Sequence, residues 1–396
     1  MNYLIFFSIV FTTLGICFSP SLLGVGDILM LFPIIYSAYW AYKNKIKLPV
    51  ASKFLILTFA ISCIMSFIAI DDTSLAIKAV KKSRYFLIGA LSFYPLYHFF
   101  NSNNKLKDFV KKYYMGFFLA CFATSFAYGL FQIIQNEGNI FALLSGARMP
   151  GSIHITKFAY ISSFTASLVI SFISLLKLDR GNKKSAIALA ALSVVGVLVA
   201  KTRGALLSLL VSLSATIYYK SKKLALVLFS AFIILIGLMI ALQSTEFAKS
   251  TRFLTLKNNS TSYRISLYEA GIKIFQEKPL TGYGYKQSVN EIERVKTQYN
   301  IDHPQFIERI HHTFLEIAAD IGIFGLLAFS GWFFSWGYLT LVSPSAFTKS
   351  TLALVINAFV CAQFDVFNQT VMFAFILLAF NMSLVTDRLA RNKLNE

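Results

Sequence analysis

The chain has 396 residues, of which 56% are hydrophobic and only 14% are charged, with 40 phenylalanines and 19 tyrosines. This composition excludes an ordinary soluble domain and indicates a polytopic membrane protein. The formal net charge is +19 at pH 7, yet the sequence contains no visible nucleic-acid-binding module. In a membrane protein, such an excess of cations favours contact with anionic lipid headgroups or lipid-linked phosphates.

Nearly uncharged stretches long enough to cross about 30 Å of hydrocarbon occur about a dozen times. They lie near 3–19, 22–42, 54–70, 85–101, 113–134, 156–176, 185–200, 203–219, 224–243, 312–338, 351–367 and 370–386. Because lipid offers no hydrogen bonds to a bare backbone, we predict an all-α integral membrane domain over residues 1–396. The stretch 3–19 lacks a basic leader and an A-x-A-like site, so the first helix is expected to be retained.

Lysine and arginine concentrate in alternate short loops, at 43–53, 105–112, 177–184, 220–223 and 387–393. By the positive-inside rule these loops face the cytoplasm, which places both termini inside and agrees with twelve spans. Two basic segments then fall on the outer side. One is an expected loop at 77–84, "IKAVKKSR", which includes Lys81 and Arg84; the other is the large loop at 244–310, which holds ten Lys or Arg. These cations favour a phosphate ligand, although lysines that merely flank helices are an alternative.

Within the large loop, "STSYRISLYEAGIKIFQEKPL" at 260–280 predicts an amphipathic helix. Its expected apolar face consists of Ile265, Tyr268, Ile272 and Phe275. Thr261 or Ser262 is expected to cap the start, and Pro279 follows the end. Arg264 then lies in the first turn, and "LTGYGYKQ" at 280–287 supplies two glycines for a tight turn.

The segment "RIHHTFLEIAADIGIFGLL" at 309–327 places titratable side chains directly before an apolar run. Thr313 and Glu316 form a capping-box pattern, which predicts a helix that starts near Phe314 and leaves His311 and His312 just outside. The positive end of a helix favours a bound anion and keeps an imidazole neutral. A base beside a phosphate site suits a transferase with a phosphate leaving group.

The same residues also have purely structural explanations. A histidine at a helix end can simply anchor the interface or bond a backbone carbonyl, although the neighbouring Arg309 favours a functional site. Glu316 is explained as a capping residue, whereas Asp320, one turn further on, has no local explanation. Because an ionised side chain in a membrane is costly, both acids are expected to face the bundle interior or a wet cavity. For Asp320, a functional alternative is a role in a proton relay, as in a transporter.

Two further segments on the outer side carry cations. "AKTRGALLSLL" at 200–210 puts Lys201 and Arg203 at a helix start, and arginine is suited to bidentate phosphate recognition. "GARMPGSIHIT" at 146–156 offers Arg148 beside a Pro-Gly turn. Helix-flanking arginines are also common by chance.

We predict neither a metal site nor disulfides. Asp71 and Asp72 are adjacent acids without further ligands, which makes a poor Mg²⁺ cage and favours solvated loop acids. The cysteines stand singly inside apolar spans, as buried small hydrophobes do. They are Cys17, Cys63, Cys121 and Cys361.

Several of these motifs resemble those of the O-antigen ligase family. "HHTFLEIAADIGIFGLL" is similar to the signature H-N-x-x-L-x-x-x-x-x-x-G, with His311, Leu315 and Gly322 at its defined positions. "KTRGALLSLL" resembles the family's arginine-glycine helix start, and "YRISLYEAGIKIFQEKPLTGYGY" resembles its periplasmic helix and G-x-G stretch. The motifs fall within about residues 140–330. Where the family usually has Asn this chain has His312, which leaves open which histidine acts, although the spacing selects His311.

The resemblance implies a multi-pass enzyme of the bacterial inner membrane, with a GT-C-like bundle and one large periplasmic loop at 244–310. Such an enzyme transfers O-antigen from undecaprenyl pyrophosphate to a sugar hydroxyl of lipid A-core on the periplasmic side, in an inverting reaction without metal or nucleotide cofactor. By position, His311 would act as the general base or orient the acceptor hydroxyl, and Arg203 and Arg264 would hold the pyrophosphate. Further substrate-binding residues are expected to be His312, Arg309, Lys81, Arg84, Arg148 and Lys201. The expected partners are the donor, the acceptor and membrane lipids, but no nucleic acid.

Two alternatives stay open. A polymerase of the same superfamily would use the same donor but add the glycan to another lipid-linked repeat unit. A transporter of lipid-linked sugars would predict inverted repeats and helices broken near mid-membrane. The sequence shows neither, and Asp320 is the only support for the transporter.

Overall fold

The computed structural model describes the chain except residues 103, 140–142, 144–147, 150, 153, 219–220, 228–229, 231–233, 235–258, 302–308 and 368–369. The described part is helical and contains no strand. Seven of its helices are long and apolar enough to cross a membrane, and three shorter apolar helices accompany them. The prediction of an all-α polytopic membrane protein is confirmed, whereas the count of twelve spans stays a prediction.

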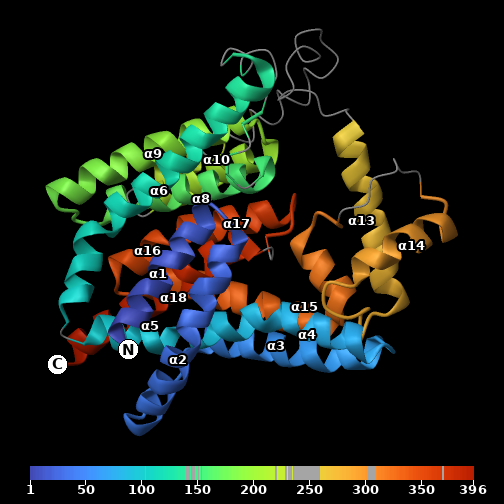
Figure 1. Cartoon of the computed structure of the whole chain (residues 1–396), viewed down its shortest axis with the longest axis horizontal. Helices are drawn as coiled ribbons and strands as arrows, with labels where there is room; N and C mark the ends of the chain where they lie inside the picture. The colour runs from blue at the N-terminus through green and yellow to red at the C-terminus, as the bar shows by residue number, and fades with distance from the viewer. Residues whose placement is uncertain are drawn as a thin grey trace.

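The described helices are numbered in chain order. They are α1 (Asn2–Cys17), α2 (Pro20–Lys43), α3 (Val50–Ala69), α4 (Thr73–Leu91), α5 (Phe93–Asn101), α6 (Lys105–Glu137), α8 (Ile155–Leu175), α9 (Arg180–Ala200), α10 (Arg203–Tyr218), α13 (Asn259–Glu277), η2 (Ser288–Glu291), α14 (Ile292–Gln298), α15 (Thr313–Val342), α16 (Ala346–Ser350), α17 (Leu352–Ala362) and α18 (Thr370–Asn395). Figure 1 shows α13 and α14 together at one end of the molecule, beside the start of α15. The predicted span at 224–243 lies largely outside the described residues.

The basic segment 77–84 is helical, so its prediction as a loop is wrong. It belongs to α4, which begins at Thr73 and is capped by Asp72, whose carboxylate accepts the backbone N–H of Ser74 at 2.8 Å. The helix buries small residues at helical spacing while its lysines face outward, which is why hydropathy alone missed its first half. The small buried residues include Ala76, Ala79 and Ser83, and Phe86 is buried on the same helix.

Helix α13 confirms the amphipathic helix of the large loop but not its orientation or its cap. It begins at Asn259, before both predicted caps. Its buried face consists of Leu267, Ala270 and Ile274, which pack in a small core with residues of α14 and α15. Two residues of the predicted face, Ile265 and Ile272, are 61% and 46% exposed. In a membrane protein an outward apolar residue can face lipid, so hydrophobicity does not define the inward face.

Helix α15 is broken at Ile321 and Gly322, where the backbone leaves the helical region. Gly322 has φ 70° and ψ −172°, and a Cβ there would lie 2.1 Å from the carbonyl oxygen of Leu280. The loop that approaches so closely supplies backbone partners across the break. Its contacts are Tyr283 N to Ala319 O at 3.0 Å, Gly284 N to Asp320 O at 2.7 Å, and Ile323 N to Pro279 O at 2.8 Å.

The same loop explains Asp320, which is fully buried. Its carboxylate accepts the backbone N–H groups of Lys286 at 2.8 Å and Ser288 at 3.1 Å. Asp320 therefore fastens the loop onto α15, which is a structural role. The expectation of unbroken helices is wrong, but the break holds this loop and gives no support to a transporter.

We expect Gly322→Ala to destabilise the protein by about 3 kcal/mol or more, because the backbone is strained for any side chain and a Cβ would strike Leu280. Thermal unfolding in detergent measures the change. Gly24→Ala on α2 is the matched control, because a Cβ there meets nothing within 4 Å, and it should be neutral or slightly stabilising. Equal melting temperatures for the two variants would contradict the role given to this contact.

Candidate functional site

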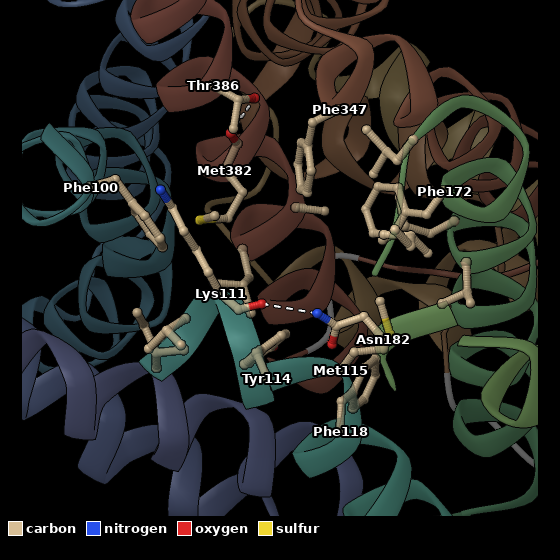
Figure 2. Close-up of a pocket in the computed structure, with 18 of the residues that line it drawn as sticks. Phe100, Lys111, Tyr114, Met115, Phe118, Phe172, Asn182, Phe347, Met382 and Thr386 are labelled. Carbon is tan, nitrogen blue, oxygen red and sulfur yellow. Dashed lines mark hydrogen bonds between the residues drawn. The ribbon is translucent and has the colours of Figure 1, made fainter. Parts of the chain in front are cut away.

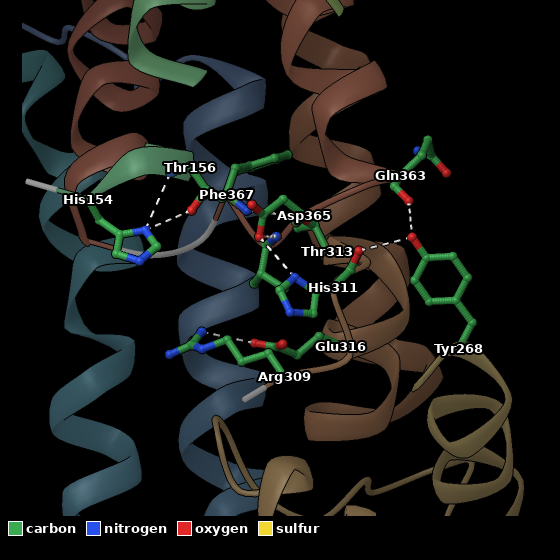
Figure 3. A network of polar contacts seen from close by, with 11 residues as sticks. His154, Thr156, Tyr268, Arg309, His311, Thr313, Glu316, Gln363, Asp365 and Phe367 are labelled. Atoms are coloured by element: carbon green, nitrogen blue, oxygen red, sulfur yellow. Dashed lines mark hydrogen bonds and ion pairs between the residues drawn. The ribbon is translucent and has the colours of Figure 1, made fainter. Parts of the chain in front are cut away.

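His311 lies against a buried carboxylate at the start of α15. Its Nδ1 is 3.4 Å from Oδ1 of Asp365, which is in the connection between α17 and α18 (Figure 3). This distance is longer than a well-formed hydrogen bond. His311 itself has φ 57°, a left-handed backbone that turns the chain sharply before the helix. An Nδ1–H directed at Asp365 leaves Nε2 as the proton acceptor of the ring.

Asp365 is held in place from several sides and is only 4% exposed. The backbone N–H of Val366 donates to its Oδ1 at 2.7 Å, and the Thr313 hydroxyl donates to its carbonyl oxygen at 2.9 Å. Burial by itself would raise the pKa of this carboxyl, but the His311 imidazole, the Val366 N–H and the charge of Arg264 hold it below the usual value. The carboxyl is therefore ionised at neutral pH and fixed in front of His311.

Helix α13 adds a tyrosine and an arginine to this site. The Tyr268 hydroxyl donates to the carbonyl oxygen of Gln363 at 2.7 Å and lies 3.3 Å from that of His311 (Figure 3). Burial raises the pKa of Tyr268, and the charge of Arg264 opposes the rise. Arg264, one turn before Tyr268, thus lies close enough to act electrostatically on Tyr268 and Asp365. Arg264 and His311 therefore both lie near Asp365.

The predicted capping box is wrong. Helix α15 begins at Thr313, within one residue of the prediction, but its cap is His312, whose Nδ1 accepts the backbone N–H of Leu315 at 3.2 Å. Burial lowers the pKa of His312, and a hydrogen bond with Gln363 opposes this. A neutral His312 accepts this bond, so its ring has a structural task that His311 does not share.

Glu316 is free of a capping role and pairs with a cation instead. Its Oε1 accepts from Nη1 of Arg309 at 3.3 Å, and its side chain is 5% exposed. Its Oε2 is buried without a hydrogen-bond partner. The Arg309 side chain is 31% exposed, and it lies between the buried Glu316 and the surface of a pocket.

This pocket is basic and has a volume of about 360 Å³. It is lined by Lys82, Arg84, Tyr85, Lys286, Ser288, Val289, Arg309 and Glu316. Four cations face a single carboxylate, so an anion of two or more charges would be stabilised there. The substrate-binding expectations for Arg84 and Arg309 fall on this pocket. Lys81 is exposed and is not part of the lining; the α-helix turns Lys82 into the pocket instead.

Lys286 is the most deeply placed of these cations. Burial lowers its pKa to about 8, and the charge of Arg309 acts in the same direction. Its backbone N–H is the one bound by Asp320. The G-Y-G-Y-K loop therefore carries a lysine whose charge changes just above physiological pH.

Arg148 and Lys201 hold two connections together. Arg148 donates from Nε to the carbonyl oxygen of Ala200 at 3.1 Å and from Nη2 to the Thr202 hydroxyl at 2.9 Å. Lys201 ends α9 in the left-handed conformation, and its Nζ donates to the carbonyl oxygen of Leu143. These contacts fix the turn that leads into α10. The expected roles of both residues in substrate binding stay predictions.

Arg203 is the first residue of α10, and its neighbour shows where it lies. A Cβ on Gly204 would be 2.2 Å from the hydroxyl oxygen of Tyr160 and 3.1 Å from Cβ of Phe364. Phe364 directly precedes Asp365, so the start of α10 borders the His311 site. Only glycine permits this approach.

Asp365, Lys82, Lys286 and Tyr268 were not singled out as site residues from the sequence. A signal existed for Asp365, because it is the only charged residue between Lys349 and Asp387, and a lone acid in a membrane segment is costly unless it has a partner. Nothing local identified its partner, since 54 positions separate it from His311. The choice of Lys82 over Lys81 required the helical phase of α4.

Residues 188–330 match the family model described as O-antigen ligase. The match covers 143 of the 396 residues and supports an assignment to the O-antigen ligase family. The matched segment contains Arg203, Arg264 and His311, together with the loop and glycine that break α15, and it ends before Asp365. It also supports a general assignment to the ligase and polymerase superfamily, whose members act on polysaccharide and lipid-linked substrates. No curated protein matches the chain.

We expect the basic pocket to bind inorganic pyrophosphate less tightly as the pH rises through about 8, because Lys286 then loses its proton. Loss of one charged hydrogen-bond donor should weaken binding by about tenfold. Thermal-shift titrations between pH 6.5 and 9.5 measure the affinity.

Lys286→Arg should remove most of this pH dependence, since arginine stays charged throughout. Lys81→Arg, one residue from the pocket lining, is the control and should keep the wild-type profile, which separates titration of the pocket from titration of the ligand. An unchanged profile in Lys286→Arg would show that another group titrates.

Proposed function

We propose that this protein is an O-antigen ligase that transfers O-antigen glycan from undecaprenyl pyrophosphate to a sugar hydroxyl of lipid A-core. The observation that supports it best is the pairing of His311 with a buried, ionised Asp365 beside Arg264, within the family's matched segment. The proposed setting is the bacterial inner membrane, with the site open to the periplasm.

In the proposed step, the acceptor hydroxyl oxygen attacks the anomeric carbon of the donor glycan. A new carbon–oxygen bond forms while the bond from that carbon to the pyrophosphate oxygen breaks. Nε2 of His311 takes the hydroxyl proton, and Asp365 stabilises the resulting imidazolium through Nδ1. Attack from the face opposite the leaving group inverts the anomeric carbon.

The bond electrons leave with the pyrophosphate, so cations must meet the charge that develops on its oxygens. Arg264 is the first candidate because its charge already acts on Asp365. Arg203 borders the same site through Gly204 and is the second. In this proposal no metal ion or nucleotide takes part, and the arginines supply the positive charge.

The basic pocket gives a second anionic group a place beside the first. Lys82, Arg84, Lys286 and Arg309 line it, and Arg309 lies close to His311 in Figure 3. We assign this pocket to phosphate-bearing parts of the lipid-linked substrates. Two separate cationic regions suit a reaction that brings two anionic lipids together.

We expect His311→Ala and Arg264→Ala each to reduce transfer by at least about a hundredfold while membrane insertion stays normal, because a general base and charge stabilisation each contribute on this scale. The assay is transfer from undecaprenyl pyrophosphate to lipid A-core by purified protein in EDTA. His98→Ala is the control, since His98 packs on Trp40 of α2 and has no part in the site.

The outcomes separate the proposals. Near wild-type transfer by His311→Ala would refute the base, and a strict Mg²⁺ requirement would refute metal independence. If wild-type protein uses a lipid-linked repeat unit as acceptor but not lipid A-core, it is a polymerase of the same superfamily.

Asp365→Asn should lower the maximal rate by about a hundredfold or more with little change in KM, because an amide does not stabilise the imidazolium. It should also shift the acidic limb of the pH–rate profile to lower pH, since the base loses its anionic partner. Asp387→Asn is matched to it: this acid is at the far end of α18, where it pairs with Arg391 at 2.9 Å. A purely structural Asp365 would lower stability and leave the pH profile in place.

A further inference from the structure

A second cavity, whose lining includes no residue of the His311 site, is almost entirely apolar. It has a volume of about 530 Å³, within the range of small-molecule sites. Side chains of α1, α5, α6, α8, α16 and α18 line it. Among them are Phe118 and Phe172 (Figure 2). The reaction proposed above uses none of these residues.

An empty space of this size is unfavourable in a close-packed bundle. The lining atoms have no partners across the void and lose their dispersion contacts. Water does not fill such a space well, because each molecule needs two to four polar partners that the lining does not offer. An apolar occupant such as an acyl chain would therefore be stabilised in this cavity.

One end of the cavity is charged. Lys111 near the start of α6, Asn182 near the start of α9 and Lys393 near the end of α18 all line it. Asn182 Nδ2 donates to the carbonyl oxygen of Lys111 at 3.3 Å, which ties the two helix starts together (Figure 2). In the part of the chain that the structure describes, neither lysine ammonium has a hydrogen bond or an ion pair.

Two acids near this end are engaged elsewhere, while a third, Asp108 in the first turn of α6, is exposed. Asp179 accepts the backbone N–H of Asn182 as the cap of α9, and Asp387 pairs with Arg391. Further cations lie near Lys111, Asn182 and Lys393 in the sequence. They are Lys105, Lys107, Lys112, Arg180, Lys183, Lys184 and Arg388. The mouth of the cavity is thus positive, with an apolar interior behind it.

Helix α18 sets the distance between this end and the His311 site. It begins at Thr370, just after Asp365, and Lys393 lies 23 residues further on, which is about 35 Å along a helix. A lipid whose phosphate sits at Lys393 therefore cannot present that phosphate to His311.

We propose that this cavity binds an anionic glycerophospholipid, with an acyl chain in the apolar interior and the phosphate between Lys111 and Lys393. Charge complementarity selects an anionic headgroup over a zwitterionic one. The occupant is a lipid of the leaflet opposite the His311 site, and it stabilises the packing of α6, α8 and α18. This inference is independent of the transfer reaction.

The test compares the binding of different lipids to the purified protein after its own lipids have been removed. Phosphatidylglycerol, phosphatidylcholine and undecaprenyl phosphate are added back separately, and native mass spectrometry and thermal unfolding report binding. Wild-type protein should retain one phosphatidylglycerol in preference to phosphatidylcholine and should melt at a higher temperature with it. Lys111→Ala with Lys393→Ala should weaken this binding by about 25-fold, or about fivefold for each lysine.

Two matched controls accompany these variants. Lys45→Ala with Lys53→Ala removes two exposed lysines outside the lining and should keep wild-type binding. Ala379→Phe fills the cavity and should abolish binding, whereas Ala191→Phe on the exposed side of α9 should not. A monodisperse size-exclusion profile checks folding.

Three results would overturn the inference. Equal retention of both phospholipids would remove the role of the lysines. Wild-type binding by Ala379→Phe would show that the lipid lies around the protein and not inside it. Displacement of phosphatidylglycerol by undecaprenyl phosphate would assign the cavity to the substrate's chain.

Discussion

The break in α15 is the constraint on which the rest of the site depends. A membrane helix cannot leave backbone groups unpaired, so the turn at Gly322 exists only because the loop 279–284 supplies partners. That exchange fixes the first part of α15, which begins two residues after His311. It also fixes the loop itself. The buried Asp320 accepts the backbone N–H of Lys286, which follows the loop, and the Lys286 side chain lines the basic pocket.

Near His311, two buried carboxylates are paired with positively charged or protonatable groups. Asp365 is balanced by His311 and the nearby Arg264, and Glu316 is balanced by Arg309. In a low-dielectric setting each pair acts strongly because water screens it little. The basic pocket adds Lys82, Arg84 and Lys286 to these charges, and an anion of two or more charges would be stabilised among them.

The two ends of the bundle differ in the polarity of the side chains that meet there. At the His311 end, short loops from α13, α15 and the α17–α18 connection converge, so polar groups from distant parts of the chain meet. At the other end, side chains of several helices line an apolar space, and Lys111 and Lys393 line one end of it. Helix α18 belongs to both ends, since it starts beside Asp365 and ends at Lys393. One bundle thus presents a polar site and a lipid-like site on opposite sides.

The sequence by itself determined the class of the protein. Long apolar stretches in lipid must be helices, and the spacing from His311 to Leu315 and Gly322, with the arginine-glycine helix start, was enough to indicate the family. It also brought His311, Arg264 and Arg309 into one region, because they belong to the same loop and its borders. These inferences hold because they depend on local composition and on residues near in the chain.

Only the tertiary structure decided which groups meet. Asp365 reaches His311 from another helix connection, Lys82 displaces Lys81 by the phase of α4, and α13 turns Leu267 inward instead of Ile265. Asp320, which locally suggested a proton relay, bonds the backbone of the G-Y-G-Y-K loop. The physical reason is common to all four: in a membrane, lipid and protein interior are equally apolar, so hydrophobicity marks the spans but not the faces that pack or the partners that buried charges find.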